Sequence, residues 1–287
     1  MIPKKEILIK ANEWKVIADT VDKDYVLGHF LNTFFSFERN RELFAFKGGT
    51  CLRKCYFPDF RFSEDLDFTL LDKSFPINAL FFEEIATRCE KLSGIRFWVR
   101  SFENKQFNNE EKGYKCKISF WGANHIRNEM PPPQERWLSK IEIDVSFDEV
   151  VLTPLMLKRV IHPYSDHVTF GGIEIPVYSL TEVLTEKVRA FFQRNYKAPR
   201  DYFDVWYLLK NVSFEDYKVI SVMLQKKCEL KNVIIDTSIF ENEDTFKTVS
   251  MAWDRSIAYH LPINKLPDIN EVWKYLGDNL FSEFLKL

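Results

Sequence analysis

The sequence predicts a protein of the α+β class (mixed α/β), with a mixed β-sheet flanked by helices and then a mainly helical C-terminal lobe. Three observations predict this fold. The segments 65–70 and 141–147 alternate polar and apolar residues, which is typical of half-buried strands. Helical patterns cover residues 5–43 and 77–93. After a short strand at 173–178, the pattern is helical almost to residue 287.

The remaining elements follow in chain order. Gly48 and Gly49 form a turn after the first helical region, and a short helix is expected at 50–56. Two further strands are expected at 95–102 and 114–121, with the polar run 104–113 as the hairpin loop between them.

The change from mixed to helical patterning indicates two lobes. We place the boundary near residue 175. Residues 1–175 would form the lobe that carries the candidate metal-binding carboxylates. Residues 176–287 would form a mainly helical lobe that completes the cleft.

Composition limits the possible classes of protein. The 287 residues include 40 basic and 42 acidic side chains, a net charge of −2, so no global basic field indicates nucleic-acid binding. RNA contact would have to be local. The candidates near the glycine turn are Arg53, Lys54 and Arg61, and those near a second motif are Lys187, Arg189, Arg194, Lys197 and Arg200. Five cysteines without a Cys-x-x-Cys pair indicate reduced thiols and a cytoplasmic protein. We find no signal peptide and no apolar run long enough to span a membrane, so we expect no membrane association.

Asp65 and Asp67 are the first candidate metal ligands. On a strand with period-two alternation, both side chains lie on the polar face, while Leu66 and Phe68 turn to the core. Two carboxylates roughly 7 Å apart repel each other unless a cation lies between them. Magnesium suits this position because it binds a few carboxylate oxygens together with substrate phosphates.

A third carboxylate is predicted on the strand at 141–147. Its alternation buries Ile143 and Val145 and leaves Asp144 on the polar face. If this strand neighbours the Asp65–Asp67 strand, Asp65, Asp67 and Asp144 form one metal-binding group. An Asp-x-Asp pair alone is more often a solvated strand face, and the combination with the glycine turn favours the functional interpretation.

The glycine turn predicts a phosphate-binding site. Backbone N–H groups around Gly48 and Gly49 are exposed to anionic oxygens in such a turn, and Thr50 is placed to help bind a triphosphate. Lys47 could add positive charge, although a surface lysine before a turn is an equally good interpretation. Ser63 shares the polar face of the Asp65–Asp67 strand and could donate to a phosphate.

These motifs resemble the signature of the AbiEii/AbiGii toxin family. The resemblance lies in residues 46–50, Leu52, Tyr56 and the run 61–68, and it extends less specifically over most of the chain. The family consists of nucleotidyltransferases of the polymerase-beta-like superfamily and includes the MenT-type toxins. The resemblance therefore implies a nucleotidyltransferase-like fold and a toxin that is paired with an antitoxin in bacterial abortive-infection or toxin–antitoxin systems.

The resemblance also assigns a function to a second motif. Residues 179–182 have the spacing of a capping box, and Lys187 lies in the helix that follows. In the family, a lysine here is implied to contact the nucleotide triphosphate, and Arg200, Asp201 and Asp204 to line the cleft and orient the nucleotide or acceptor. The residues alone fit a structural interpretation as well, with Lys187 in solvent and Asp204 paired with Arg200.

The predicted reaction is magnesium-dependent transfer of a nucleoside monophosphate from an NTP to an acceptor hydroxyl, with manganese as a possible substitute. Asp144 is the best candidate to draw the proton from that hydroxyl. The resemblance implies a tRNA 3′ end as the acceptor and a cognate antitoxin as partner. Two alternatives stay open: a nucleotidyltransferase for small molecules such as aminoglycosides, and a non-catalytic scaffold that binds nucleotide.

Overall fold

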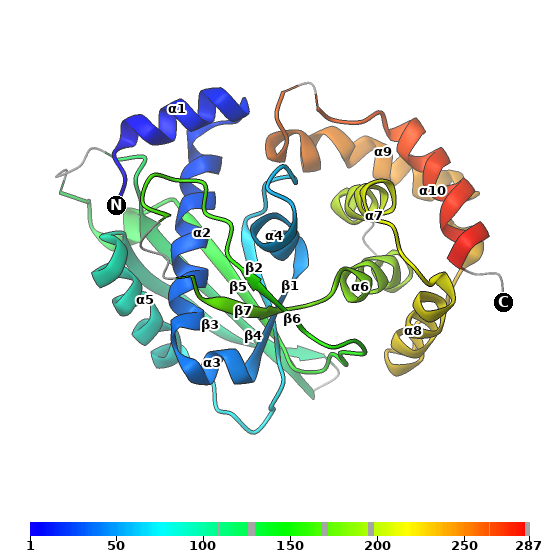
Figure 1. Cartoon of the computed structure of the whole chain (residues 1–287), viewed down its shortest axis with the longest axis horizontal. Helices are drawn as coiled ribbons and strands as arrows, with labels where there is room; N and C mark the ends of the chain where they lie inside the picture. The colour runs from blue at the N-terminus through cyan, green and yellow to red at the C-terminus, as the bar shows by residue number, and fades with distance from the viewer. Residues whose placement is uncertain (108–109, 126–129, 168–171, 195–197, 264, 285–287) are drawn as a thin grey trace. The chain divides into compact units, whose positions relative to one another are not determined.

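The computed structural model describes residues 1–287 apart from 108–109, 126–129, 168–171, 195–197, 264 and 285–287. The chain divides into two compact units (Figure 1). The first comprises Met1–Glu149 and Leu155–Val177, and the second comprises Val150–Pro154 and Tyr178–Leu287. A single boundary near residue 175 does not account for segment 150–154, which belongs with the second unit. The assignment of functions to the two parts stays a prediction.

One mixed sheet forms the centre of the first unit, as predicted. Among the described residues it has seven strands in the order β3-β4-β5-β2-β1-β7-β6. The β2–β5 and β1–β7 pairs are parallel, and the other neighbouring pairs are antiparallel. The strands are β1 (Phe44–Lys47), β2 (Asp65–Leu70), β3 (Arg96–Phe107), β4 (Glu110–Trp121), β5 (Lys140–Ser146), β6 (Met156–Arg159) and β7 (Glu174–Val177).

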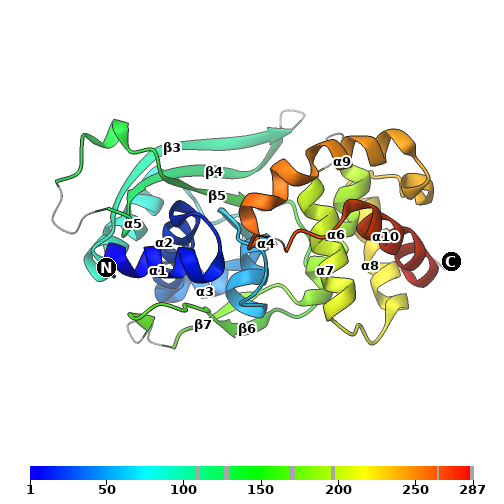
Figure 2. The same ribbon diagram turned by 90° about the horizontal axis from the view of Figure 1, so that it is seen from above.

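Four helices of the first unit lie on the apolar side of this sheet. They are α1 (Lys4–Trp14), α2 (Ala18–Ser36), α3 (Glu38–Leu43) and α5 (Ala79–Ser93), with α1 packed on α2. In Figure 2, α1, α2 and α3 lie between the β3–β5 side and the β6–β7 side of the sheet. Phe34 of α2 stacks on Phe68 of β2 with ring centroids 4.4 Å apart. Such pairs add about 0.5–1.5 kcal/mol beyond the burial of apolar area, so they hold α2 firmly on β2.

Local sequence signals set the ends of α5. The Asn78 side chain accepts a hydrogen bond from the backbone N–H of Phe81 at 3.1 Å, which caps the first turn. Gly94 ends the helix with φ of 74°, a left-handed conformation that glycine adopts at little cost. The predicted helix at 77–93 is therefore confirmed to within two residues at its start.

The helical pattern predicted over 5–43 is confirmed and divides into three helices. Two other details of the predicted secondary structure are wrong. The short strands β1 and β6 were not predicted. The run 104–113 is not simply a loop, because β3 continues to Phe107 and β4 begins at Glu110. Here the two strands form a ribbon with many exposed side chains, so no apolar alternation marks it in the sequence.

The second unit is helical, as predicted. Its helices are α6 (Leu180–Gln193), α7 (Pro199–Asn211), α8 (Tyr217–Leu230), α9 (Glu243–Ile257) and α10 (Ile269–Phe284). Aromatic rings join three of these helices, with Phe191 stacked on Tyr202 at 4.2 Å and Tyr202 stacked on Trp273 at 5.5 Å. The rings belong to α6, α7 and α10, so this cluster forms part of the core of the unit.

A buried carboxylate fixes segment 150–154 to the second unit. Glu182 on α6 is fully buried, and it accepts hydrogen bonds from the backbone N–H groups of Leu152 and Thr153. Its charge is matched by the Lys227 ammonium at 2.6 Å. The Ser179 side chain caps the Glu182 N–H at 3.1 Å, so half of the predicted capping box forms. Glu182 instead uses its side chain to anchor the incoming chain.

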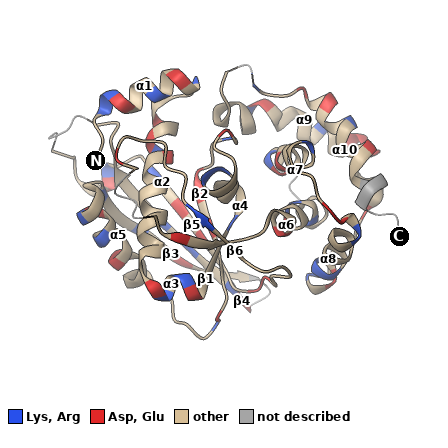
Figure 3. Cartoon of the chain, in the orientation of Figure 1, with Lys and Arg blue, Asp and Glu red and all other residues tan. Residues whose placement is uncertain are grey.

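Charged residues of both signs are mixed along the chain. Figure 3 shows Lys and Arg interspersed with Asp and Glu on the helices of each unit, in keeping with the net charge of −2. Within the part of the chain that the structure describes, no helix is both long enough and apolar enough to cross a bilayer.

Candidate active site

The register of β2 and β5 brings the predicted carboxylates together. These strands are parallel, and Asp67 pairs with Asp144 while Asp65 pairs with Glu142. Residues paired in this way point to the same face, and all four side chains are half-buried. On the opposite face, Leu66 is buried with the neighbouring apolar residues of both strands. The placement agrees with the sequence prediction, while metal binding by these side chains stays a prediction.

Gly48 allows Asp67 to reach the glycine turn. It has φ of +79°, and a Cβ atom added there would lie 2.1 Å from Asp67 Oδ2. The Asp67 carboxylate therefore rests directly against the Gly48 backbone. Any side chain at position 48 would both strain the backbone and collide with this carboxylate.

Gly49 likewise leaves room for the side chains of Arg61 and Ser63. A Cβ atom at this position would lie 2.7 Å from Arg61 Nη2 and 3.2 Å from Ser63 Oγ. Arg61 is itself buried, and its guanidinium donates to the Phe62 carbonyl at 3.1 Å. The two glycines open the short helix α4 (Gly48–Cys51), and they bring Arg61, Ser63 and Asp67 to one point of the sheet.

The other predicted phosphate-binding residues surround this point. The Thr50 hydroxyl donates to the Asp65 carbonyl, and Thr50 is buried, so its side chain fixes the start of β2. Lys47 is half-buried at the end of β1, where it pairs in register with Asp67. Ser63 is half-buried as well. Phosphate binding by Lys47, Gly48, Gly49, Thr50 and Ser63 stays a prediction.

Two of the candidate RNA-contacting residues are instead part of the core. The Arg53 Nε and Lys54 Nζ atoms lie 2.7 and 2.6 Å from the two carboxylate oxygens of Asp24. Burial opposes ionisation of Asp24, but the charges of Lys54 and Arg53 outweigh it and hold its pKa below the usual range. Burial also lowers the pKa of Lys54 despite this partner. Both cations are buried, and so is Arg61, the third candidate near the glycine turn, so the prediction that these three residues contact RNA is wrong. The candidate Lys197 lies outside the described residues.

Lysines on β3, β4 and β5 contact the acidic residues of β5. The Lys105 ammonium lies 2.8 Å from both carboxylate oxygens of Asp144. Lys115 and Lys140 lie 2.6 and 3.1 Å from Glu142. Partial burial opposes ionisation of Glu142, but the hydrogen bonds and charges of these two lysines have the larger combined effect and lower its pKa. The hydrogen bond to Glu142 in turn raises the pKa of Lys115.

The contact of Lys105 with Asp144 was not predicted from the sequence. Lys105 lies in the run taken as a loop, and the two residues are 39 positions apart. An extension of β3 to Lys105 would have been needed to predict it, because β3 and β5 are separated in the sheet by β4 alone.

The second predicted motif forms a compact charged cluster within the second unit. Lys187 on α6 lies 2.8 Å from Asp201 and 2.9 Å from Asp204, both on α7. Asp201 also accepts a hydrogen bond from Arg194 at 2.5 Å. Asp204 thus pairs with Lys187 across two helices, and Arg200 lies half-buried in the first turn of α7. Nucleotide contact by these residues stays a prediction.

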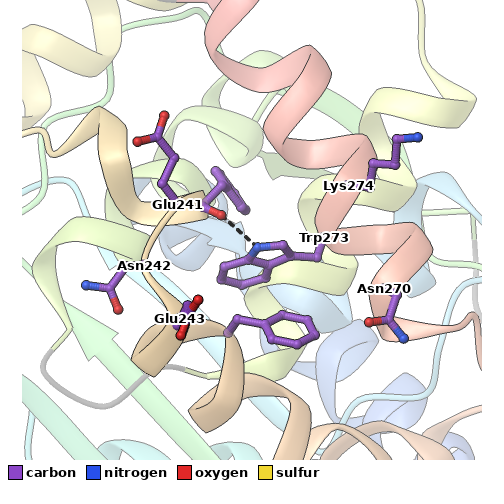
Figure 4. Close-up of a pocket in the computed structure, with 8 residues that line it drawn as sticks. Glu241, Asn242, Glu243, Asn270, Trp273 and Lys274 are labelled. Atoms are coloured by element: carbon purple, nitrogen blue, oxygen red, sulfur yellow. Dashed lines mark hydrogen bonds between the residues drawn. The ribbon is translucent and has the colours of Figure 1, made fainter.

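A separate hollow in the second unit has a volume of about 240 Å³ (Figure 4). Its walls include the rings of Phe240, Phe246 and Trp273, and the Trp273 indole donates to the Phe240 carbonyl at 2.9 Å. Polar side chains at its edge include Glu241 and Lys274. None of the residues that the motifs single out lines this hollow.

A comparison with protein families identifies one family. Residues 29–275 match the family described as the nucleotidyl transferase AbiEii toxin of type IV toxin–antitoxin systems. No curated protein matches the chain.

Two solved structures share the fold. MenT4, a nucleotidyltransferase toxin from Mycobacterium tuberculosis, has 18% sequence identity and a TM-score of 0.65, covering 100% of this chain and 91% of MenT4. JHP933 from Helicobacter pylori has 15% identity and a TM-score of 0.57, covering 95% and 94% of the two chains. With the family match over most of its length, the chain belongs to the AbiEii family of nucleotidyltransferase toxins.

Proposed function

We propose that this protein transfers a nucleoside monophosphate from an NTP to an acceptor hydroxyl of RNA, at the 3′ end of a tRNA. In this role it would act as the toxin of a toxin–antitoxin pair and would be controlled by a cognate antitoxin. The proposal depends above all on the parallel register that sets Asp67 beside Asp144 on one sheet face, with Asp65 two residues away on the same strand.

Asp65, Asp67 and Asp144 would hold Mg²⁺, or Mn²⁺ in its place. The residues fit such an ion because carboxylate oxygens are the ligands that it prefers, and because Gly48 leaves room for the Asp67 carboxylate beside the turn. The chemistry that such an ion would supply is polarisation of the α-phosphoryl group and neutralisation of charge on the pyrophosphate.

The chain itself would position the reactants and move one proton. The acceptor oxygen forms a bond to the α-phosphorus, the bond to the β-phosphate oxygen breaks, and pyrophosphate leaves. Asp144 would take the proton of the acceptor hydroxyl. The backbone N–H groups of Gly48 and Gly49, with the Ser63 hydroxyl, would bind the triphosphate.

The charged cluster of α6 and α7 would contribute further nucleotide contacts. Asp201 and Asp204 hold the Lys187 ammonium in a defined place, which reduces the entropy lost when it binds a phosphate. Arg200, at the start of α7, could contribute a second cation. We assign these roles from the resemblance of the motif to the family.

The charge pattern of the sheet supports an anionic acceptor. In register, Lys115 of β4 pairs with Asp144 and Lys117 pairs with Glu142, so these lysines share the face of the carboxylates. Lys115 already bonds Glu142, so Lys117 is the better candidate of the two to contact a phosphate backbone.

A labelling screen tests the proposal. The purified protein is incubated with Mg²⁺, each of the four α-labelled NTPs and either total RNA, purified tRNA or a panel of aminoglycosides. We expect label in tRNA, and in none of the reactions without Mg²⁺. Label confined to small molecules would identify a different acceptor class, and absence of label and of pyrophosphate release in every reaction would contradict an enzymatic role.

We expect Lys105→Met to strengthen binding of Mg²⁺ or Mn²⁺ at the carboxylates. The Lys105 ammonium occupies both oxygens of Asp144, so it competes with a divalent cation for the same carboxylate. Partly exposed ion pairs contribute up to about 1 kcal/mol, which corresponds to roughly fivefold in affinity. Titration calorimetry with Mg²⁺ measures the change.

The matched control for this variant is Lys112→Met. Lys112 lies on the same hairpin but pairs with Glu110 at 2.6 Å, so its removal should leave metal affinity unchanged. Equal or weaker metal binding by Lys105→Met would show that Lys105 does not compete with the ion.

A further inference from the structure

A cluster of two histidines and an aspartate lies in the first unit, built from residues outside the proposed active site. Helix α2 contributes His29, and the segment between β6 and β7 contributes His162 and Asp166. His29 Nε2 lies 3.1 Å from Asp166 Oδ2, and His162 Nε2 lies 2.9 Å from Asp166 Oδ1. Each residue offers one ligand atom, and these atoms all lie within 4.8 Å of one another.

The cluster is enclosed but retains access to solvent. The side chains of His29 and His162 are 7% and 1% exposed, whereas that of Asp166 is 21% exposed. A small ligand could therefore approach past Asp166 and meet two imidazole nitrogens that are held in a dry environment. Buried imidazoles are poorly hydrated, so little water has to be removed from them when they bind an ion.

Gly28 makes room for one of the ligands. A Cβ atom at Gly28 would lie 2.7 Å from His162 Nδ1 and 3.4 Å from its Cε1, so the ring packs directly on the backbone of α2. Glycine inside a helix weakens it relative to alanine. Its presence in α2 is explained by the need to admit the His162 ring next to His29.

Tyr25 orients the carboxylate from the other side. Its hydroxyl donates to Asp166 Oδ2 at 2.7 Å and accepts from the backbone N–H of Ile2 at 3.1 Å. Tyr25 and His29 are one helical turn apart on α2. Partners of this kind fix the direction of a ligating carboxylate and are a regular feature of metal sites.

One lysine lies close to the cluster, and its charge is shared with a carboxylate. This lysine is Lys54, whose Nζ lies 3.6 Å from the Cβ position of Gly28, on which the His162 ring packs. Lys54 is matched by Asp24 at 2.6 Å. Asp166 therefore supplies a negative charge for an incoming ion, although its two histidine bonds and the Tyr25 bond already stabilise it.

We infer that His29, His162 and Asp166 form a binding site for a divalent transition-metal ion of the zinc class, separate from the carboxylates of β2 and β5. Two imidazoles and one carboxylate are a donor set for zinc or iron, with a remaining position open to water. The oxygen-only set of Asp65, Asp67 and Asp144 suits magnesium instead. Ligand chemistry would thus direct two kinds of ion to two places in one chain, and the zinc-class ion would clamp residues 162–166 onto α2.

Zinc binding to the full chain, freed of any histidine tag, tests this inference. The protein is dialysed against Zn²⁺ in the presence of excess Mg²⁺, which occupies the oxygen site, and bound zinc is measured by mass spectrometry. We expect about one zinc ion per chain and a zinc-dependent rise in the melting temperature. The expected effect of Asp166→Asn and of His29→Gln is at least a tenfold loss of zinc affinity.

Controls separate loss of a ligand from loss of the fold. His167→Gln alters an exposed histidine of the same segment, whose Nδ1 faces the Tyr164 carbonyl at 3.1 Å, and it should bind zinc like the wild type. Circular dichroism without zinc should be the same for all variants, and Asp166→Asn keeps the shape of the side chain. Wild-type protein without stoichiometric zinc, or Asp166→Asn with wild-type zinc affinity, would overturn the inference and leave a purely hydrogen-bonded cluster. Either result leaves the nucleotidyl-transfer proposal untouched.

Discussion

Asp67→Asn is expected to reduce nucleotidyl transfer on the order of 10³-fold or more, because an amide replaces the carboxylate that would hold the metal ion. Asp67 lies in register with Asp144 on the neighbouring strand, and its carboxylate rests against Gly48. It therefore links the carboxylate group to the glycine turn. Asparagine has nearly the same shape, so the packing against Gly48 should be retained. The rate of label incorporation from the NTP identified in the screen measures the loss.

A nearby aspartate gives the matched control for this variant. Asp72 follows β2 and is exposed, and its carboxylate accepts hydrogen bonds from Ser74 only two residues away. Asp72→Asn should transfer nucleotide at the wild-type rate. If Asp67→Asn is folded by circular dichroism and still transfers within tenfold of the wild-type rate, Asp67 is not a metal ligand.

Asp24→Ala should destabilise the fold by about 3–5 kcal/mol, because it leaves the buried Arg53 and Lys54 cations without their shared carboxylate. The Tyr164 hydroxyl, which donates to Asp24 at 2.8 Å, loses its acceptor as well. A change of this size lowers the melting temperature by about 10 °C in a protein of this length. Thermal unfolding followed by circular dichroism measures it.

The effect of Asp24→Ala should depend on pH. The folded-state pKa of Asp24 is below its usual range, so its contribution to stability is complete above the unfolded pKa of about 4 and declines as the pH falls through that value toward the folded pKa. The difference in melting temperature between wild type and variant should therefore narrow below about pH 4. Glu13→Ala, an exposed change on α1, should shift stability by less than about 0.5 kcal/mol. A constant difference across the pH range would contradict the ionic origin of the effect.

The alternation in β2 and β5 is the part of the fold that the sequence predicts best. Each strand has one face in the core and one toward solvent, so Leu66 and Val145 alternate with acidic residues over several positions. Strands β1 and β6 lack this signal for different reasons. The first three residues of β1 are all buried, including Phe44 and Phe46, whereas β6 is mostly exposed along its length. Neither pattern distinguishes a strand from its surroundings.

Long-range partners explain why parts of the site could not be predicted. Asp65 and Asp67 share one strand, so simple geometry places them on one face. The contact between Lys105 and Asp144 depends on the pairing of β3, β4 and β5, and the contact between His29 and Asp166 joins residues 137 positions apart. Arg53 and Lys54 were wrongly expected at the surface. Their partner Asp24 lies on another helix, so the sequence does not show that both cations are buried in an ion pair.

Binding of Mn²⁺ at equilibrium, followed by paramagnetic resonance, tests most directly whether three carboxylates act together. The measurement uses the Asp166→Asn background, so that the histidine cluster does not contribute, and compares Asp65→Asn, Asp67→Asn and Asp144→Asn in turn. We predict that the background protein binds Mn²⁺ in the presence of a non-hydrolysable NTP and that each of the three changes weakens binding at least tenfold. Wild-type Mn²⁺ affinity in Asp144→Asn would contradict the account, because the third carboxylate would then not belong to the metal site.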